Sequence, residues 1–523
     1  MDHATLAEEI DAALSISHEA FSQQVQEEAE YLLEDIHDGM FDNPQAITGF
    51  EYELYAVKAQ SGTLARVPRR LLEYIGFEKE LGLHNAELST QPLPLNGDGV
   101  AAQEAAVRAQ IRAATACVET EGMQLVSDGL WTIPPAGETA TAYLTDTEDV
   151  KGYTLAHNMS AAPRYHAMAN TETPAQPAMH LDVPNVSLKA QTVMPESLIA
   201  SIQPHYQVPV ATDLPERFRY ALRIAGPLVA LGANAPFVPA DLYDDVAPEK
   251  ILADSWVEQR IPIFETMLNS ATVTQDMVTF PHDIDTVEEA ITRIATDPVL
   301  VPLETEETGR FDDRYASFRM KHGTHWRWIR PVFDGSSRSA ANARLEFRPL
   351  SAQPTIRDSI AFLAVFAGLM EALPEHDHPL IDQSWKQAEA NFYAAAQDGF
   401  DATMEWITSD GTVTSDSLVL YRDILEQAAA GLRNAGLDEA SIATYLGPLR
   451  RRVRYGTTPA AWKRDRVSQQ IDNGATLAEA IRTMQQEYIE RQQETLFTGD
   501  FSEWLEDDRY RQGVHKPPKR DFL

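Results

Sequence analysis

Cysteine is nearly absent from this chain of 523 residues, which contains only Cys117. A single thiol excludes an intrachain disulfide, a cysteine-rich zinc site and an iron–sulfur cluster. Cys117 falls within a pattern typical of an amphipathic helix, so a plain helix residue is a simpler interpretation than a catalytic nucleophile. The sequence therefore offers no cysteine chemistry on which a function can rest.

Basic residues are also few, because 43 Lys and Arg stand against 79 Asp and Glu, giving a formal net charge of −36. A protein that binds the nucleic-acid backbone needs basic patches, so general nucleic-acid binding is excluded. The acidic residues are spread along the whole chain instead of forming a tail. This distribution suits a protein that is solvated in high salt, and it predicts a halophilic, cytoplasmic origin.

Long apolar runs are absent as well. The segment 360–373 is strongly apolar but too short to span a bilayer, which predicts a buried core helix and no membrane association. The acidic N-terminus lacks a signal-peptide pattern. Phosphate-loop, dinucleotide, His-Glu-x-x-His and Gly-x-Ser-x-Gly motifs are missing too. Any bound nucleotide would therefore have to be held by carboxylate-bound magnesium together with Arg or Lys side chains.

The most informative feature that is present is an alternating acidic strand at residues 49–55. Residues two apart in a strand share a face, so Glu51 and Glu53 point the same way. Two carboxylates roughly 4 Å apart repel by about 4 kcal/mol at an effective dielectric near 20. Water, a shared proton or bound cations can each relieve this repulsion, and an exposed strand face gives the same pattern. The third solution would indicate a magnesium-dependent enzyme.

Two further charged segments follow at a distance. Glu80 and Glu87 lie in residues 80–92, where one capping and one surface carboxylate would give the same composition. The segment 343–349 is predicted to be a strand, and it places three charged side chains on one face: Arg344, Glu346 and Arg348.

Basic side chains on two other predicted strands are candidates for binding an anion. Lys189 and Gln191 share a face of the strand predicted over 186–193, and Lys189 either is solvated or binds a phosphate or substrate carboxylate. Arg330 follows a Trp-rich segment, where it either forms a bidentate contact with a carboxylate or pairs with a surface acid.

The chain divides into three predicted parts. Residues 1–46 form a helical N-terminal extension, residues 47–355 a catalytic α+β domain, and residues 356–523 a helical C-terminal part that packs on the same domain. A long helix is predicted at about 100–121. Beyond residue 356 the pattern is helical throughout, interrupted only by turns.

Taken in order, these segments resemble the glutamate–cysteine ligase family, specifically its carboxylate–amine ligase branch. Residues 49–55 are similar to the opening strand of that family, and residues 80–92 to its second acidic motif. The resemblance covers about residues 47–500. Later segments that are similar to family motifs lie at 163–168, 230–237, 328–331, 344–348 and 391–399.

This resemblance implies a glutamine synthetase-like fold, in which an antiparallel sheet curves into a funnel, carries the active site on its inner face and is surrounded by helices. It also implies an ATP-dependent ligase that uses Mg²⁺ or Mn²⁺. In such a reaction a carboxylate becomes an acyl phosphate, and the resemblance implies that this carboxylate belongs to glutamate. The amine of cysteine or another amino acid then displaces phosphate, as in γ-glutamylcysteine biosynthesis.

The resemblance also implies roles for single residues. Arg348 would contact ATP and the transferring phosphoryl group, and Arg330 would bind the substrate carboxylate, both as catalytic residues. Lys189 would contact ATP and substrate. Additional substrate contacts would come from Arg164 and Tyr165. The metal ligands would be Glu51, Glu53, Glu80, Glu87, Gln191 and Glu346.

One departure from the family pattern leaves an alternative open. The family usually has Gln-Val-His on its third strand, with the His as a metal ligand, whereas residues 189–191 of this chain read Lys-Ala-Gln. A Gln carbonyl also coordinates a hard cation, but Lys189 would change which anion is favoured. The alternative is a non-catalytic relative that binds a nucleotide or amino acid and regulates a partner. Formation of a homo-oligomer is a further open prediction.

Overall fold

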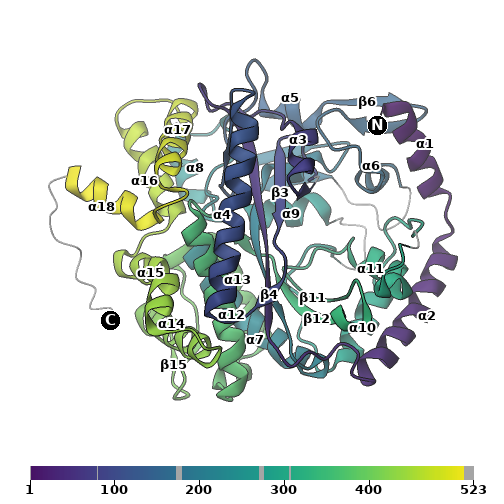
Figure 1. The fold of residues 1–523 in the computed structure, drawn as a ribbon. Coiled ribbons are helices and arrows are strands. Elements are labelled where there is room, and N and C mark those ends of the chain that lie inside the picture. Colours follow the sequence, from purple (N-terminus) through teal and green to yellow (C-terminus); the bar gives the residue numbers. More distant parts are fainter. Residues whose placement is uncertain (1, 79, 172–178, 270–275, 306–307, 512–523) are drawn as a thin grey trace.

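A nine-stranded antiparallel sheet runs through the middle of the computed structural model (Figure 1). The structure describes residues 2–78, 80–171, 179–269, 276–305 and 308–511. The main path through the sheet is β11-β12-β10-β1-β3-β2, while β4 and β5 pair with β1 and β13 pairs with β10. Its strands are β1 (Ile47–Lys58), β2 (Phe77–Glu78), β3 (Asn85–Ser89), β4 (Leu93–Pro94), β5 (Met123–Val126), β10 (Ser201–Gln207), β11 (Ile329–Asp334), β12 (Asn342–Phe347) and β13 (Leu350–Ser351).

Alternation of apolar and charged residues along β1 gives this central strand two different faces. Phe50, Tyr52 and Leu54 are almost completely buried, and they face the hydrophobic core. Glu51 and Glu53 lie on the opposite face and are only partly buried. The predicted strand and its two faces are therefore confirmed.

Helices cover the apolar face of the sheet. The predicted core helix is α12 (Ile356–Glu375), which is buried along nearly its whole length, and Phe366 stacks on Phe347 of β12 with ring centroids 4.7 Å apart. Other helices of this layer and of the C-terminal part are α4 (Gly97–Glu119), α7 (Leu214–Gly232), α13 (Trp385–Asp398), α14 (Ser417–Asn434), α15 (Glu439–Tyr455), α16 (Pro459–Asp472), α17 (Leu477–Thr495) and α18 (Phe501–Arg511).

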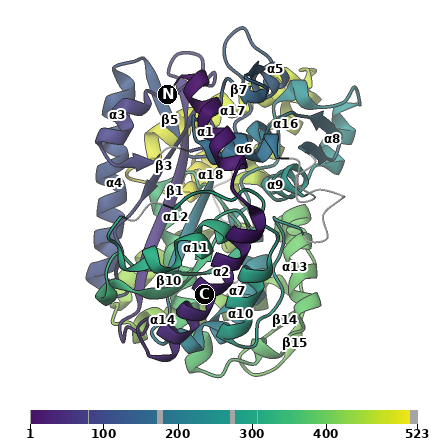
Figure 2. The same cartoon turned by 90° about the vertical axis from the view of Figure 1, so that its right-hand side faces the viewer.

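The N-terminal extension consists of α1 (His3–Leu14) and α2 (His18–His37), which run along the side of the molecule away from the C-terminal helices (Figures 1 and 2). Its amphipathic face is buried, and the backbone N–H of Phe318 donates to the buried carboxylate of Glu28 at 2.8 Å. The extension therefore packs firmly against α10 (Val287–Thr296) and α11 (Ala316–His322).

Shorter elements complete the described chain. The remaining helices are α3 (Arg69–Tyr74), α5 (Ala140–Thr145), α6 (Pro163–Asn170), α8 (Pro248–Asp254) and α9 (Arg260–Leu268). Two small hairpins are β6 (Thr147–Val150) with β7 (Tyr153–Ala156), and β8 (His180–Val183) with β9 (Val186–Lys189). Across the described ranges, no helix is both long enough and apolar enough to cross a lipid bilayer.

The expectation that everything beyond residue 356 is helical is wrong at one place. Strands β14 (Trp406–Ile407) and β15 (Val413–Thr414) form a hairpin whose turn contains Gly411 at φ 81°. A glycine adopts this left-handed conformation without steric cost. Trp406 anchors the hairpin by donating its indole N–H to Asp423 at 2.8 Å. Two-residue strands leave too short a pattern in the sequence to be recognised.

Candidate active site

A cavity of about 330 Å³ lies over the polar face of the sheet, where β1, β3 and β10 meet. Helix α6 and the loop before β3 supply further parts of its wall. Its acidic side chains are Glu51, Glu53, Glu78, Glu80, Glu87 and Glu196. Its basic side chains are Arg164, Arg330 and Arg348. The sequence predicted four of these acids and all three of these arginines as site residues.

Strand register explains why carboxylates that are distant in the sequence gather here. Glu53 on β1 lies opposite Glu87 on β3, and Glu87 in turn lies opposite Glu78 on β2. Directly opposed residues of an antiparallel pair point to the same face. Three neighbouring strands therefore place a row of carboxylates along one wall of the cavity.

Too few positively charged groups lie beside these carboxylates to keep them ionised easily. Burial, together with the adjacent Glu80, raises the pKa of Glu53 to about 7. The same two causes raise the pKa of Glu87 well above its usual range, and Glu87 also shares a hydrogen bond with Glu80. A bound cation would relieve the repulsion between these uncompensated carboxylates.

Polar groups of β10 fix the orientation of Glu53. The backbone N–H and the hydroxyl of Ser201 each donate to the Glu53 carboxylate at 2.7 Å, and the side-chain amide of Gln203 donates at 2.9 Å. Such hydrogen bonds lock the side chain so that its oxygens keep one position in the cavity.

The opposite side of the site is built around Glu346, which is almost fully buried on β12. Arg330 donates to both Glu346 oxygens at 2.9–3.1 Å, and Arg348 forms an ion pair with the same carboxylate. Although burial opposes ionisation, the two guanidinium groups hold the pKa of Glu346 well below its usual range. Glu346 thus lies beneath the arginines in this structure, and its expected role as a metal ligand stays a prediction.

Glu51 connects the acidic and basic sides. Its carboxylate lies 3.3 Å from His205 Nε2, and Arg344 donates to His205 Nδ1 at 3.1 Å. Nδ1 accepts this hydrogen bond, which leaves Nε2 as the ring nitrogen that faces Glu51. Burial alone would raise the pKa of Glu51, but His205 and Arg348 outweigh it and leave this pKa below its ordinary value. Glu51 is therefore the readily ionised acid of the β1 pair.

A larger hollow of about 640 Å³ continues from the same place, since Glu51 and Ser89 line both cavities. Its wall includes His205, Arg310 and Arg344. The site thus has room for an extended ligand that passes over Glu51.

Two predicted site residues lie elsewhere, which corrects the sequence analysis. Lys189 ends β9 in the separate β8–β9 hairpin, Gln191 follows it and bonds to Thr147 at 2.8 Å, and both side chains are exposed. The strand beside β1 is β10, where Glu51 lies opposite Gln203. The two strands of this hairpin pair with each other and not with β1. Their residues therefore do not reach the face of the main sheet that bears Glu51.

Several residues of the site were missed from the sequence. Gln203 and His205 follow the order of the family's Gln-Val-His pattern with Pro204 in the middle, so a signal for them was present. Glu196 lies on a short 3₁₀ helix, η1 (Met194–Leu198), with no periodic pattern that marks it. Burial and the nearby Glu80 raise its pKa well above the usual range. Only the tertiary structure places it among the other acids.

The donor set fits a hard divalent cation, because carboxylate oxygens are the ligands that Mg²⁺ and Mn²⁺ prefer. Within the described residues, the one group of three acidic, His or Cys side chains whose ligand atoms all lie within 4.8 Å of one another is at another place. The cavity acids are therefore spaced more widely than in a closed metal cage. Mutual repulsion between uncompensated carboxylates accounts for this spacing.

An antiparallel sheet that presents clustered carboxylates and arginines on one face, with helices behind it, is the glutamine synthetase-like fold that the sequence predicted. The chain belongs to glutamate–cysteine ligase family 2, because the model of that family matches residues 47–495. Both the family resemblance and the predicted fold class are confirmed.

A solved structure with a TM-score of 0.50 shares this fold. A glutamate–cysteine ligase from Francisella tularensis in complex with AMP is 12% identical, with a TM-score of 0.50, over 91% of this chain and 94% of that chain. A bifunctional glutathione synthetase from Pasteurella multocida is also 12% identical, with a TM-score of 0.45, over 89% of this chain and 55% of that chain. At such identities the likeness concerns the fold alone. No curated protein sequence matches the chain.

Proposed function

We propose that this protein is an ATP-dependent ligase that joins the γ-carboxylate of glutamate to the amine of cysteine or a similar amino acid. The observation that carries the proposal is the convergence of Glu51, Glu53, Glu80 and Glu87 in one cavity, opposite Arg330 and Arg348. Transfer of a phosphoryl group depends chiefly on positioning and charge neutralisation, and these two sets of side chains supply both.

The acidic side of the cavity is assigned to Mg²⁺ or Mn²⁺. Glu51, Glu53, Glu80 and Glu87 would hold the ions, and the raised pKa values of Glu53 and Glu87 support this assignment. When bound, the ions neutralise the phosphate oxygens of ATP. Hydrogen bonds from Ser201 and Gln203 keep the Glu53 carboxylate oriented toward the cavity.

The basic side is assigned to the anions that react. Arg348 would contact the transferring phosphoryl group, and Arg330 would bind the substrate carboxylate, as the family pattern implies. Their common partner Glu346 holds both guanidinium groups in place before any substrate arrives. Arg164 and Tyr165 on α6 line the same cavity and would contact the substrate from the other wall.

The proposed reaction has two steps. A carboxylate oxygen attacks the γ-phosphorus of ATP, so that the bond to ADP breaks and an acyl phosphate forms. The amine then attacks the acyl carbon, phosphate leaves, and the amine loses a proton as the amide forms. Charged donors such as Arg348 stabilise the negative charge that develops in both steps.

A regulatory relative without catalysis is the competing function. Its support was the apparent replacement of Gln-Val-His by Lys-Ala-Gln at residues 189–191. The structure removes that support, because β10 carries Gln203 and His205 next to Glu51. We therefore favour the ligase.

The decisive experiment measures ADP release in the presence and absence of Mg²⁺, glutamate and an amine, over a wide range of salt concentrations. We expect release to require all three components, and mass spectrometry to identify a γ-glutamyl amide. A panel of amino acids then defines the acceptor. Tight binding of ATP without amine-stimulated turnover at any salt concentration would instead establish the regulatory function.

A further inference from the structure

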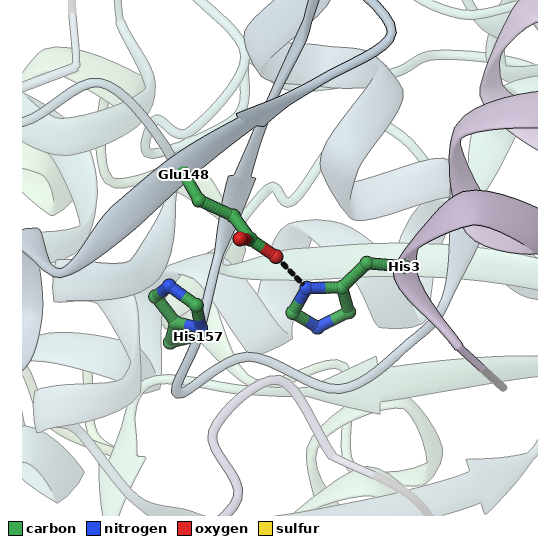
Figure 3. A group of neighbouring side chains, drawn as sticks. All are labelled: His3, Glu148 and His157. Carbon is green, nitrogen blue, oxygen red and sulfur yellow. Dashed lines mark hydrogen bonds and ion pairs between the residues drawn. The ribbon is translucent and has the colours of Figure 1, made fainter.

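A second cluster of ligand-type side chains lies at the N-terminal edge of the molecule, outside the acidic cavity. It consists of His3, Glu148 and His157, whose ligand atoms all lie within 4.8 Å of one another (Figure 3). His3 belongs to α1, Glu148 to β6, and His157 follows β7. The family match begins at residue 47, so nothing in the family pattern accounts for a residue of α1 in this cluster.

The hairpin geometry explains how two of these residues meet. The backbone N–H of His157 donates to the carbonyl of Asp146 at 3.0 Å, which continues the β6–β7 pairing by one more residue pair. Opposed residues share a face, and Glu148 lies two residues from Asp146 on the same strand. Glu148 and His157 therefore project from one face of the hairpin.

Contacts of α1 with this hairpin bring in the third residue. Asp2 caps the helix by accepting from the backbone N–H of Thr5 at 2.9 Å, which fixes the first turn where His3 lies. Further along, Lys151 donates to Glu8 at 2.6 Å and the Tyr153 hydroxyl donates to Asp11 at 2.6 Å. His3 Nδ1 is then in direct contact with the Glu148 carboxylate.

We propose that His3, Glu148 and His157 form a binding site for Zn²⁺ or a similar divalent transition metal. Two imidazoles and one carboxylate are a common protein donor set for zinc, and a water molecule occupies the fourth position. Imidazole nitrogen is a poor ligand for Mg²⁺, which prefers oxygen, so this site differs chemically from the acidic cavity.

The geometry requires only a small rearrangement, in which His157 moves closer while His3 and Glu148 move slightly apart. Zinc-bound nitrogen and oxygen atoms lie about 2.0–2.2 Å from the ion, so tetrahedral donors are separated by roughly 3.4 Å. Because His157 is exposed and the other two side chains are half-buried, they are free to make this adjustment. The metal would replace the direct contact between His3 and Glu148.

Such a metal would fasten the N-terminal helix to the wall of the proposed active site. Helix α1 packs against the β6–β7 hairpin and against α6, and α6 carries Arg164 and Tyr165 of the cavity. The metal would join the extension to the α6 wall without touching the reacting groups.

The test titrates Zn²⁺ into the full chain against a chromophoric chelator, in excess Mg²⁺ so that the cavity acids are occupied. We expect one tight Zn²⁺ site per chain, which raises the melting temperature. His3→Ala and His157→Ala should each weaken binding by roughly 100-fold or more, since even outer-shell partners change metal affinity by 10–100-fold. Co²⁺ should give the visible spectrum of a tetrahedral site.

A matched control is available within the same extension. His37 pairs with Glu288 at 2.7 Å, which is also an exposed His–Glu contact, but no third donor accompanies it within the described residues. His37→Ala should therefore leave zinc binding unchanged. His157→Ala is the most diagnostic variant, because it keeps the contact between His3 and Glu148.

The alternative is a plain ion pair between His3 and Glu148. In that case the His157→Ala variant binds Zn²⁺ as tightly as the unmodified chain and shows the same melting temperature with zinc, which would overturn the proposal. Should a His3 variant fold poorly, Glu148→Gln gives the same test from the hairpin side. None of these measurements depends on ATP turnover, so they stand or fall separately from the proposed ligase function.

Discussion

Two regions of this molecule bury charged side chains, and they differ in how the charges are balanced. In the cavity on the polar face of the sheet, Glu53 and Glu87 have raised pKa values because neighbouring acids add to the cost of burial. Among the C-terminal helices Arg452 pairs with Asp358 at 2.9 Å, and where these helices meet the rest of the chain Lys463 pairs with Asp128.

The difference indicates what each region is for. The helical contact gives its cations further hydrogen bonds, from Arg452 to Gln353 at 2.7 Å and from Lys463 to the carbonyl of Asn234 at 2.8 Å. In a matched buried pair each charge compensates the other, so the fold is destabilised when only one partner is removed. An excess of one sign inside a cavity adds no stability, so the cavity acids point to a ligand of opposite charge. The predictions below test this contrast.

The largest effect on stability is expected where a matched pair is broken. Asp128→Ala should lower the free energy of unfolding by about 3–5 kcal/mol, because it leaves the buried Lys463 ammonium without its carboxylate. Urea unfolding followed by circular dichroism measures this loss. The double variant Asp128→Leu with Lys463→Met should lose clearly less. A loss of less than about 1 kcal/mol in the free energy of unfolding of Asp128→Ala, which is the size expected for a surface ion pair, would contradict this account.

In the cavity, removal of a charge should affect catalysis instead of folding. Glu51→Gln should reduce ADP release by about 100- to 1,000-fold, because a preorganised charge at the proposed metal site is lost. Its free energy of unfolding should fall only slightly, because the favourable interactions of the carboxylate with His205 and Arg348 are lost while repulsion from Glu346 falls. Glu27→Gln, on the exposed face of α2, is the matched control. Unchanged turnover in the Glu51 variant would refute the metal assignment.

The pH dependence of stability should also separate the two regions. The Glu53 pKa is 4.5 ordinarily and about 7 in the folded protein, so the folded state binds more protons between these values. Stability contributed by this group is therefore complete below pH 4.5 and is lost as the pH rises through 7, by up to about 3 kcal/mol. Urea unfolding of the metal-free protein at pH 5 and pH 8 measures the loss.

Two further measurements test whether Glu53 causes this pH dependence. Glu53→Gln should remove this part of the pH dependence, because the amide does not titrate. Addition of Mg²⁺ at pH 8 should restore stability in the parent but less in the variant. An identical pH profile for both proteins would show that Glu53 is not the group responsible.

The smallest of the four effects tests the corrected strand. His205→Ala should lower turnover by about 10- to 100-fold, because His205 orients Glu51 as an outer-shell partner of the proposed metal site. Lys189→Ala and Gln191→Ala should leave turnover unchanged, since both side chains are exposed on the β8–β9 hairpin. The opposite order of effects would favour the strand assignment made from the sequence.

Much of the site could be predicted because a strand leaves a short-range pattern. Alternation around Glu51, Glu53 and Glu346 shows which residues share a face, whatever the partner strands are. The choice between residues 186–193 and β10 is different, because both segments alternate and Pro204 within β10 counts against a central strand. Only the pairing with β1 distinguishes them, and pairing is a long-range property.

The boundaries at residues 46 and 355 stay predictions, as do an oligomer and growth in high salt. The main sheet lies within residues 47–351, and the described residues after 356 are helical except for one hairpin. This arrangement is compatible with a single folding unit, because α12 is buried against the sheet.

By itself the sequence determined the family, the two faces of β1 and four of the acids that line the cavity, since all of these depend on residue order over short distances. The tertiary structure alone decided that Glu196 joins these acids, that Glu346 lies under two arginines, and that His3 meets Glu148. Such meetings depend on strand register and helix docking between segments far apart in the chain. Burial and electrostatics settle them together, and no local pattern records the outcome.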